Sequence, residues 1–453
     1  MAGKIAPKVL LVSIAAALLL AGYLYRSRSS SASAQLQGCS GCNLVVVMID
    51  TLRADHLSGY GYRRETSPFI SSIMQRSAVF KRAYSTSSWT APATASFFTS
   101  ELPSQHGVIT GFAATKRMQR QGRNIDLNKL PADRATLGEF MKSAGFFTVG
   151  VADNLNIGSE MGFDRGFELF EKFYYRGAEV VAEQVDQFMQ KAPKSDPYFL
   201  YIHFMDPHHP YNKREPFYSE CLAGSEGSNQ GETVCRYDSE IRYVDEVLQK
   251  MAERYGWLEN SVIVLTSDHG EEFWDHGGTG HGDTLYREMI HVPFIIYHPH
   301  FPARSIDVNV GHIDMLPTLA ALLDMPAHKS WQGRSLKPLL NGGSFDSERI
   351  LFSERLRSRN EKKKKWRRSG VRREMHYIKT AKGRDTVFQE LFDLNQDFSE
   401  QKNIFTSDTK VGAVLSERVA ALPMPEENNE SGKVEVEVDS ETYEQLKTLG
   451  YLD

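Results

Sequence analysis

The sequence predicts an α/β fold in which a parallel sheet is buried between helices. From residue 43 onward, short apolar runs alternate with segments of helix length. The runs are unbroken instead of alternating with polar residues, which is typical of strands that are buried on both faces of a parallel sheet. In chain order, the predicted strands are Leu44–Ile49, Phe146–Val151, Tyr198–Met205, Val262–Thr266 and Val292–Tyr297.

The segments between these runs supply the predicted helices. A helix that packs on a sheet places its apolar residues three or four positions apart. The last segment shows this spacing at Ile241, Val244, Val247, Leu248 and Met251. The predicted helices are Phe69–Met74, Thr136–Ser143, Val180–Lys191 and Ser239–Tyr255.

Length and composition limit the classes of protein. The 453 residues suffice for two or three domains, or for one large α/β domain with an appendage. Hydrophobic residues make up 41% of the chain, which excludes global disorder. The net charge of −4 excludes a globally basic nucleic-acid binder, so no nucleic-acid partner is expected.

The N-terminus carries the one segment that is apolar enough to enter a membrane, Val9–Tyr25, so a polytopic membrane protein is excluded. Lys4 and Lys8 precede this segment, and Ala32-Ser33-Ala34 is a candidate signal-peptidase site. We therefore expect a membrane-anchored or secreted protein whose bulk is extracytoplasmic, in the periplasm or cell envelope or outside the cell.

The four cysteines are too few for a disulfide scaffold, but export makes disulfides feasible. Cys221 and Cys235 flank a Gly/Ser-rich loop, and we expect them to be oxidised to each other. Cys39 and Cys42 form a single CxxC, which alone supports neither a zinc site nor redox chemistry.

The pattern changes after about residue 345. Residues 355–373 contain eleven Lys or Arg and one acid, Glu361, and the tail 426–439 is acidic. The basic run is either a solvated loop or a contact with anionic lipid head groups or an acidic polymer. We predict three regions: 1–42, a signal or membrane anchor with a linker; 43–345, a catalytic domain; and 346–453, a C-terminal subdomain with the basic loop and acidic tail.

Residue types that bind metals follow three of the predicted strands. Asp50 ends the first strand, Asp206 follows the third and Asp268 follows the fourth. Because ligands bind at the carboxyl ends of strands in such sheets, these residues predict a divalent metal. Acidic residues can instead cap helices or turns. Capping would explain one such residue, but it explains acids after three strands less well than a metal site does. Further residues of these types nearby are His208, His209, His269, Asp275, His276, His281 and Asp283.

Five stretches resemble the sulfatase branch of the alkaline phosphatase superfamily, over roughly residues 43–405. They are NLVVVMIDTLRADHLSGYG, TAPATASFFTSELPSQHGV, DPHHPY, TSDHGEEFWDHGGTGHGDTLYREMIHVPFIIY and ELFDLNQDFSEQKNI. The resemblance implies a mixed, largely parallel central sheet sandwiched by helices, with a small C-terminal sheet subdomain.

Thr90 falls on the nucleophile position of this family, whose pattern is C/S-x-P-S-R. The start of a helix also suits a bound anion, whereas without a metal cluster Thr90 would be only a helix cap. Classical sulfatases convert the Cys or Ser into formylglycine, which Thr90 cannot become, and Thr94 replaces the supporting Arg. The Thr form resembles phosphodiesterases, phosphonate monoester hydrolases and phosphoethanolamine transferases of the same superfamily.

The resemblance implies roles for the other residues. Asp50, Asp268 and His269 are expected to bind the metal together with the Thr90 oxygen. Asn154 and His208 are expected to hold substrate oxygens. His281 is expected to protonate the leaving alcohol or contact the substrate anion. His276 is expected either to bind substrate or to position other residues of the site without contacting the substrate.

The ion is Ca²⁺, Mn²⁺, Mg²⁺ or Zn²⁺. One ion is favoured, although Asp206, His209 and His281 offer residue types for a second. His106 and Arg53 are interpreted as structural.

The predicted function is a metal-dependent hydrolase of phosphate, phosphonate or sulfate esters at the cell envelope, with phosphoesters favoured. The substrate is an ester of a lipid, a glycan or a small molecule. The N-terminal segment and the 355–373 loop are candidate membrane contacts. Two alternatives stay open: a phosphoethanolamine-type transferase acting on envelope lipid or glycan, and a non-catalytic binding protein of the same fold.

Overall fold

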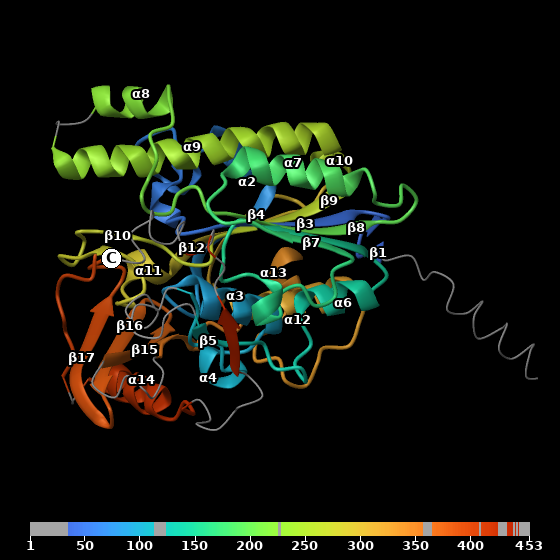
Figure 1. Cartoon of the computed structure of the whole chain (residues 1–453). Coiled ribbons are helices and arrows are strands. Elements are labelled where there is room, and N and C mark those ends of the chain that lie inside the picture. Colours follow the sequence, from blue (N-terminus) through green and yellow to red (C-terminus); the bar gives the residue numbers. More distant parts are fainter. Residues whose placement is uncertain are drawn as a thin grey trace, which may run out of the picture.

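The computed structural model describes residues 35–112, 124–224, 228–356, 365–406, 409–424 and 433–437, together with Ser440 and Tyr443. Its centre is an eight-stranded sheet, with the order β13-β4-β12-β9-β3-β8-β6-β7 (Figure 1). The strands run in one direction except β12, which is antiparallel to both of its neighbours. They span Arg304–Gly311 (β13), Ser77–Tyr84 (β4), His291–Tyr297 (β12), Ser261–Thr266 (β9), Asn43–Ile49 (β3), Tyr198–Phe204 (β8), Phe147–Ala152 (β6) and Leu169–Lys172 (β7).

Helices cover both faces of this sheet because its strands are apolar on both sides (Figure 1). Along β3, Val45 and Val47 point to one helical layer, whereas Val46 and Met48 point to the other. The first layer contains α2 (Pro68–Met74), α7 (Ala178–Met189), α9 (Asn229–Tyr255) and α10 (Trp257–Asn260). The second contains α3 (Thr90–Thr99), α6 (Leu137–Ser143), α12 (Met315–Leu322) and α13 (Lys337–Leu340).

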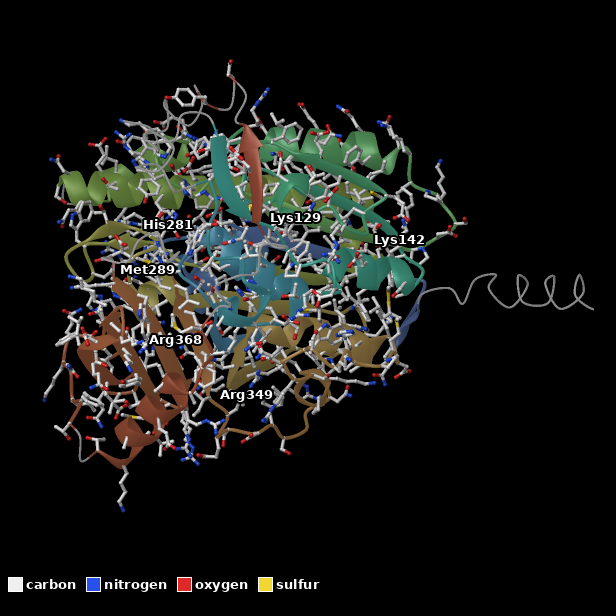
Figure 2. The ribbon with its side chains drawn as sticks, turned by 60° about the horizontal axis from the view of Figure 1, so that its bottom comes forward. Lys129, Lys142, His281, Met289, Arg349 and Arg368 are labelled. Carbon is white, nitrogen blue, oxygen red and sulfur yellow. A yellow bond between two sulfur atoms is a disulfide. The ribbon has the colours of Figure 1, made fainter. Side chains whose placement is uncertain are left out.

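A second, antiparallel sheet follows in the chain. Its order is β14-β15-β16-β17, with strands Leu351–Arg355, Lys365–Arg372, Met375–Lys382 and Asp385–Asp393. Helix α14 (Lys410–Ala420) packs on one face through Leu415 and Val419. Val371 of the same sheet packs against Leu285 and against Met289 of the short helix α11 (Arg287–Ile290), both of which precede β12. Figure 2 labels Met289 and His281 on the side of the main sheet, and Arg368 within the C-terminal sheet.

Short elements complete the fold. The remaining helices are α4 (Pro103–His106), α8 (Phe217–Ala223) and α11 (Arg287–Ile290), with 3₁₀ turns at Ala54–His56, Ser58–Tyr60, Ser159–Met161 and His312–Asp314. The remaining strands pair as β1 (Gln35–Leu36) with β2 (Cys39–Ser40), β10 (Glu272–Phe273) with β11 (Thr279–Gly280), and β5 (Asn124–Asn128) with β18 (Lys433–Glu437).

The predicted fold class is confirmed. Each of the five predicted strands forms within one residue of its predicted bounds. The run Val292–Tyr297 lies in β12, which is antiparallel to its neighbours and not parallel as the apolar run predicted. An apolar run indicates that a strand is buried, but it contains no information about the direction of the strand. Helix α9 begins at Asn229, ten residues before the predicted start, with the Ser228 hydroxyl accepting a hydrogen bond from the Gly231 N–H.

The predicted Cys221–Cys235 disulfide is present and ties α8 to α9, and Cys39 and Cys42 are also joined. The apolar segment Val9–Tyr25 and Ala32-Ser33-Ala34 lie outside the described residues, as does the middle of the basic run, residues 357–364. Among the helices of the described part, none has the length and apolar character needed to cross a membrane.

Candidate active site

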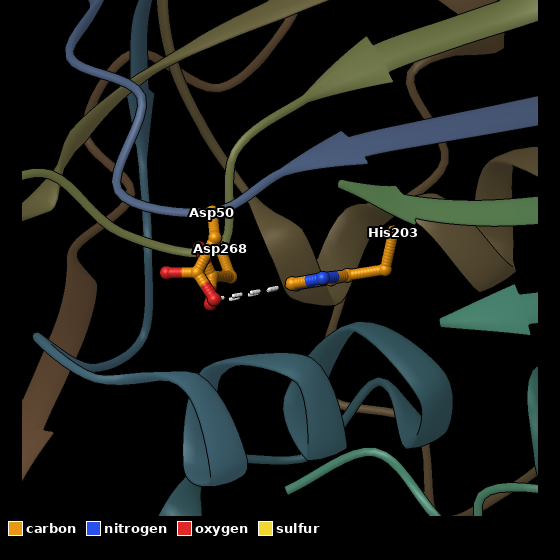
Figure 3. Close-up of side chains that lie close together, drawn as sticks. All are labelled: Asp50, His203 and Asp268. Carbon is orange, nitrogen blue, oxygen red and sulfur yellow. Dashed lines mark ion pairs between the residues drawn. The ribbon is translucent and has the colours of Figure 1, made fainter. Parts of the chain in front are cut away.

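The site forms where the carboxyl ends of three parallel strands meet. In the register of the sheet, Met48 of β3 lies beside His203 of β8 on one side and Thr266 of β9 on the other. Side chains two positions apart share a face of a strand, so Asp50 and Asp268 follow on the face that carries His203. Figure 3 shows these three side chains directed toward one another.

These residues form a fully buried cluster that His269 completes. His203 Nε2 lies 3.8 Å from Asp50 Oδ2 and 3.8 Å from Asp268 Oδ2. His269 Nε2 lies 3.6 Å from Asp50 Oδ1 and 3.4 Å from Asp268 Oδ2. Burial raises the pKa of Asp50 well above its ordinary value, and the nearby Asp268 charge adds to this effect.

The cluster fits a divalent cation. Within the described chain, Asp50 Oδ1, Asp268 Oδ2 and both ring nitrogens of His203 have no hydrogen-bond partner. Each such buried group costs about 1–3 kcal/mol when it is left unsatisfied. Carboxylate oxygens and imidazole nitrogens that converge without partners are the donor set of a metal site, and Asp50, His203 and Asp268 are close enough to share one ion.

Thr90 lies beside this cluster as the first residue of α3. Its Oγ1 is 3.4 Å from Asp50 Oδ2 and 3.3 Å from His269 Nε2. His269 Nδ1 lies 2.8 Å from the Gly270 carbonyl, which can only accept, so Nδ1 carries the proton and Nε2 presents its lone pair to the cluster. Burial lowers the pKa of His269 to about 4, which keeps the ring neutral.

Asn154 contacts the cluster through Asp50. Its Nδ2 donates to Asp50 Oδ2 at 2.7 Å, and its Oδ1 accepts from the Asn156 N–H at 2.8 Å. The amide group is therefore fixed in orientation. Its Nδ2 carries a second N–H, which is the donor that could reach a substrate oxygen.

His281 and His208 lie on the other side of His269. The His281 ring centroid is 4.5 Å from that of His269 and 4.9 Å from that of His208. Burial opposes protonation of His281, but Glu271 Oε1, 3.1 Å from Nδ1, outweighs it and leaves the pKa raised. Burial lowers the pKa of His208 to about 3, and the His281 charge adds to this.

The structure does not bring His276 to the cluster. Its Nδ1 lies 2.8 Å from Glu288 Oε1, its Nε2 lies 3.1 Å from the Glu400 carbonyl oxygen, and its ring stacks on Tyr286. The contact of Nδ1 with Glu288 stays within the segment before β12, whereas the contact of Nε2 with Glu400 connects that segment to the C-terminal region. Asp206 is likewise held apart, with Arg214 Nη2 2.8 Å from its Oδ1.

The residues interpreted as structural have structural partners. Arg53 forms ion pairs with Asp55 at 2.9 Å and Asp275 at 2.8 Å, which braces the segment after Asp50. His106 Nε2 lies 3.0 Å from Ser96 Oγ inside the second helical layer.

Two site residues were missed by the sequence analysis. His203 is a single imidazole within the otherwise apolar strand YFLYIHF, and that isolation was its one signal. Glu271 belongs to the quoted TSDHGEE stretch, but nothing in the sequence separates it from Glu272.

Two protein-family models match the chain. The Sulfatase family model matches residues 42–325, and the N-sulphoglucosamine sulphohydrolase C-terminal model matches residues 280–423. The chain is 22% identical over 364 residues to the uncharacterized sulfatase YidJ of Escherichia coli, which covers 65% of this chain and 70% of that protein.

Two further proteins align over most of the chain. The Delta 4,5-hexuronate-2-O-sulfatase of Bacteroides thetaiotaomicron is 21% identical over 451 residues, covering 84% of this chain and 88% of that protein. The solved structure of a phosphonate monoester hydrolase from Silicibacter pomeroyi has a TM-score of 0.65 at 18% identity, and the match covers 88% of this chain and 100% of that chain.

Proposed function

Because the chain belongs to the sulfatase family, we propose that it is a metal-dependent hydrolase of phosphate, phosphonate or sulfate esters in which Thr90 is the nucleophile. The observation that carries the proposal is the position of Thr90 Oγ1, within 3.4 Å of Asp50 Oδ2 and His269 Nε2 at the start of a helix. A hydroxyl needs such neighbours to become an effective nucleophile.

Asp50, His203, Asp268 and His269 are the residues that would hold the metal. When bound, the ion supplies positive charge that favours loss of the Thr90 proton and offsets negative charge on the ester oxygens. Two imidazoles beside two carboxylates favour Zn²⁺ or Mn²⁺ over Ca²⁺ and Mg²⁺, which prefer oxygen ligands. We therefore place Zn²⁺ and Mn²⁺ first among the four ions.

The chain's own groups account for the bond changes. As a bond forms between Thr90 Oγ1 and phosphorus, Oγ1 gives its proton to Asp50 Oδ2, 3.4 Å away, and the bond from phosphorus to the alcohol oxygen breaks. His281, held by Glu271 through Nδ1, donates the proton of its Nε2 to that departing oxygen.

The second N–H of Asn154 Nδ2 holds a non-bridging oxygen. His208 is not assigned this role, because its ring is neutral and its Nδ1 lies 2.6 Å from the His209 carbonyl, which leaves only a lone pair on Nε2. Water then attacks the phosphorus of the phospho-threonine and gives one proton back to His281 Nε2. The bond from phosphorus to Oγ1 breaks, and Oγ1 takes its proton back from Asp50 Oδ2.

We propose that the enzyme prefers phosphoesters to sulfate esters, for two reasons. Thr90 cannot be converted into the formylglycine on which classical sulfatases depend. Thr94, which replaces the Arg that supports formylglycine, lies with its Oγ1 3.8 Å from Met48 Sδ in the core. The relatives named above include a hexuronate sulfatase and a phosphonate monoester hydrolase, so both ester classes belong in the test.

We also propose an extracytoplasmic location. The Cys221–Cys235 disulfide supports it, because disulfides persist in oxidising compartments and are rare in the cytosol. The apolar N-terminal run predicted from the sequence is consistent with export.

The test is a panel of aryl sulfate, aryl phosphate, phosphodiester and phosphonate monoester, each assayed with protein loaded with Zn²⁺ or Mn²⁺. We expect turnover of the phosphodiester or phosphonate to exceed that of the sulfate. Asp268→Asn, which keeps the side-chain shape, should lose both metal and turnover. Faster turnover of the sulfate would contradict the phosphoester preference, and a metal-loaded protein that cleaves no ester would contradict the hydrolase assignment.

A further inference from the structure

A row of four side chains crosses the C-terminal sheet. Arg355 of β14 lies opposite Arg367 of β15, Arg367 opposite Thr380 of β16, and Thr380 opposite Phe388 of β17. Directly opposite residues in antiparallel strands point to the same face. With about 4.8 Å between neighbouring strands, the row extends about 14 Å.

The row begins at the active site. Arg355 donates from Nε to the Gly282 carbonyl, and Arg367 donates from Nη1 to the Asp283 carbonyl. Gly282 and Asp283 follow His281 directly. The guanidinium of Arg355 also lies over the Trp89 ring, 5.5 Å from its centroid, and Trp89 directly precedes Thr90. Arg355 thus contacts the segments that carry both the nucleophile and the proposed proton donor.

The row lies on the face of the sheet opposite α14. Tyr377 and Leu391, which pack against α14, belong to the alternate positions of β16 and β17. At the outer end of the row, Phe388 is 52% exposed. The row therefore leads from the buried site toward solvent, with two guanidinium groups first and an aromatic ring last.

We propose that Arg355 and Arg367 form a subsite for a second anionic group, carried by the alcohol part of the substrate, with Phe388 contacting the apolar surface beyond it. This rests on the proposed function, because His281 defines which side of the site the alcohol leaves from. A guanidinium binds carboxylate, sulfate or phosphate through paired N–H donors in a fixed plane. The Gly282 and Asp283 carbonyls fix the two guanidinium groups in orientation, which favours recognition of one anion at a defined distance.

Direct binding to the metal-loaded full chain tests this proposal without requiring turnover. Two non-hydrolysable benzylphosphonates serve as probes, one with a carboxylate on the far side of the ring and one with a carboxamide in its place. Calorimetry should show the carboxylate binding about tenfold more tightly to the wild type, as expected for a charge-assisted hydrogen bond. Arg355→Gln and Arg367→Gln should each remove most of this preference. Arg384→Gln, which removes the same charge from the exposed β16–β17 turn, should keep it.

Equal affinity of the two probes for the wild type would overturn the proposal. A preference for the carboxylate probe that persists in both Arg variants would also overturn it. So would an equal loss of affinity for both probes in these variants, which would mean that the arginines only support the loop after His281. Phe388→Ala should lower the affinity for both probes equally. Unchanged affinities would exclude Phe388 from the subsite.

Competition then identifies the source of the anion. Displacement of the carboxylate probe by a tri-uronate indicates an acidic glycan, displacement by phosphatidylglycerol vesicles indicates a lipid head group, and displacement by neither indicates a small anionic alcohol. A protein that hydrolyses no ester but keeps the probe preference would contradict the proposed function and leave the subsite standing.

Discussion

His203 offers a sharp test of the metal site, because it is fully buried and both of its ring nitrogens lack hydrogen-bond partners within the described chain. If four side chains share a binding free energy of about 10–16 kcal/mol, as in tetrahedral zinc sites, each contributes about 2.5–4 kcal/mol. His203→Leu should therefore weaken Zn²⁺ binding by about 70- to 900-fold.

The loss can be measured as stability. At a metal concentration of 1,000 times the wild-type Kd, bound metal stabilises the wild type by about 4.1 kcal/mol, and a hundredfold weaker variant by about 1.4 kcal/mol. An unfolding entropy of about 2.1 cal/mol/K per residue over 453 residues converts the difference of about 2.7 kcal/mol into about 3 °C. The metal-induced rise in Tm should be smaller in His203→Leu by about that amount.

The matched control is His106→Leu, the same change at a buried histidine whose partner is Ser96. It should lower Tm without metal but keep the full metal-induced rise. Competition with a chelating dye gives Kd independently. A wild-type Kd in His203→Leu would refute the four-residue site and leave Asp50, Asp268, His269 and Thr90 as the ligands.

Two further predictions concern stability. Burial opposes protonation of His276, but hydrogen bonds to Glu288 and the Glu400 carbonyl outweigh it and raise the pKa of His276 from 6.5 to about 9. The contribution of His276 to the free energy of unfolding is therefore full below pH 6.5 and is lost as the pH rises through 9. Denaturant titrations should show wild type losing about 2–3 kcal/mol more than His276→Gln between pH 6 and 10, and equal losses would contradict the pairing. Cys221→Ser opens the loop to Cys235 and should cost about 3 kcal/mol in unfolding free energy under non-reducing conditions, whereas an unchanged value would argue against the disulfide.

The parts of the site that the sequence could predict are those that follow strand ends. Asp50 directly follows one apolar run, Asp268 stands two residues beyond another, and the fold brings the ends of adjacent parallel strands together. Thr90 required the family resemblance, because a Thr before a short helix is ordinarily a cap.

The parts that could not be predicted depend on register and side-chain direction. His203 reaches Asp50 because β8 pairs with β3 so that His203 lies beside Met48, and an isolated sequence contains no pairing register. The antiparallel direction of β12 could not be predicted from the sequence for the same reason. His276 stands in the same Gly/His-rich loop as His281, yet the loop turns it toward Glu288 and away from the cluster.

Mass spectrometry of acid-quenched, metal-loaded enzyme can detect the covalent intermediate that we propose on Thr90. During turnover of a slow aryl phosphodiester, we expect a phosphoryl adduct on the peptide that contains Thr90. Thr90→Ser should retain partial activity and the adduct, whereas Thr90→Ala should lose the adduct and several orders of magnitude of turnover. Wild-type turnover in Thr90→Ala, with no adduct on that peptide in the wild type, would rule out Thr90 as the nucleophile.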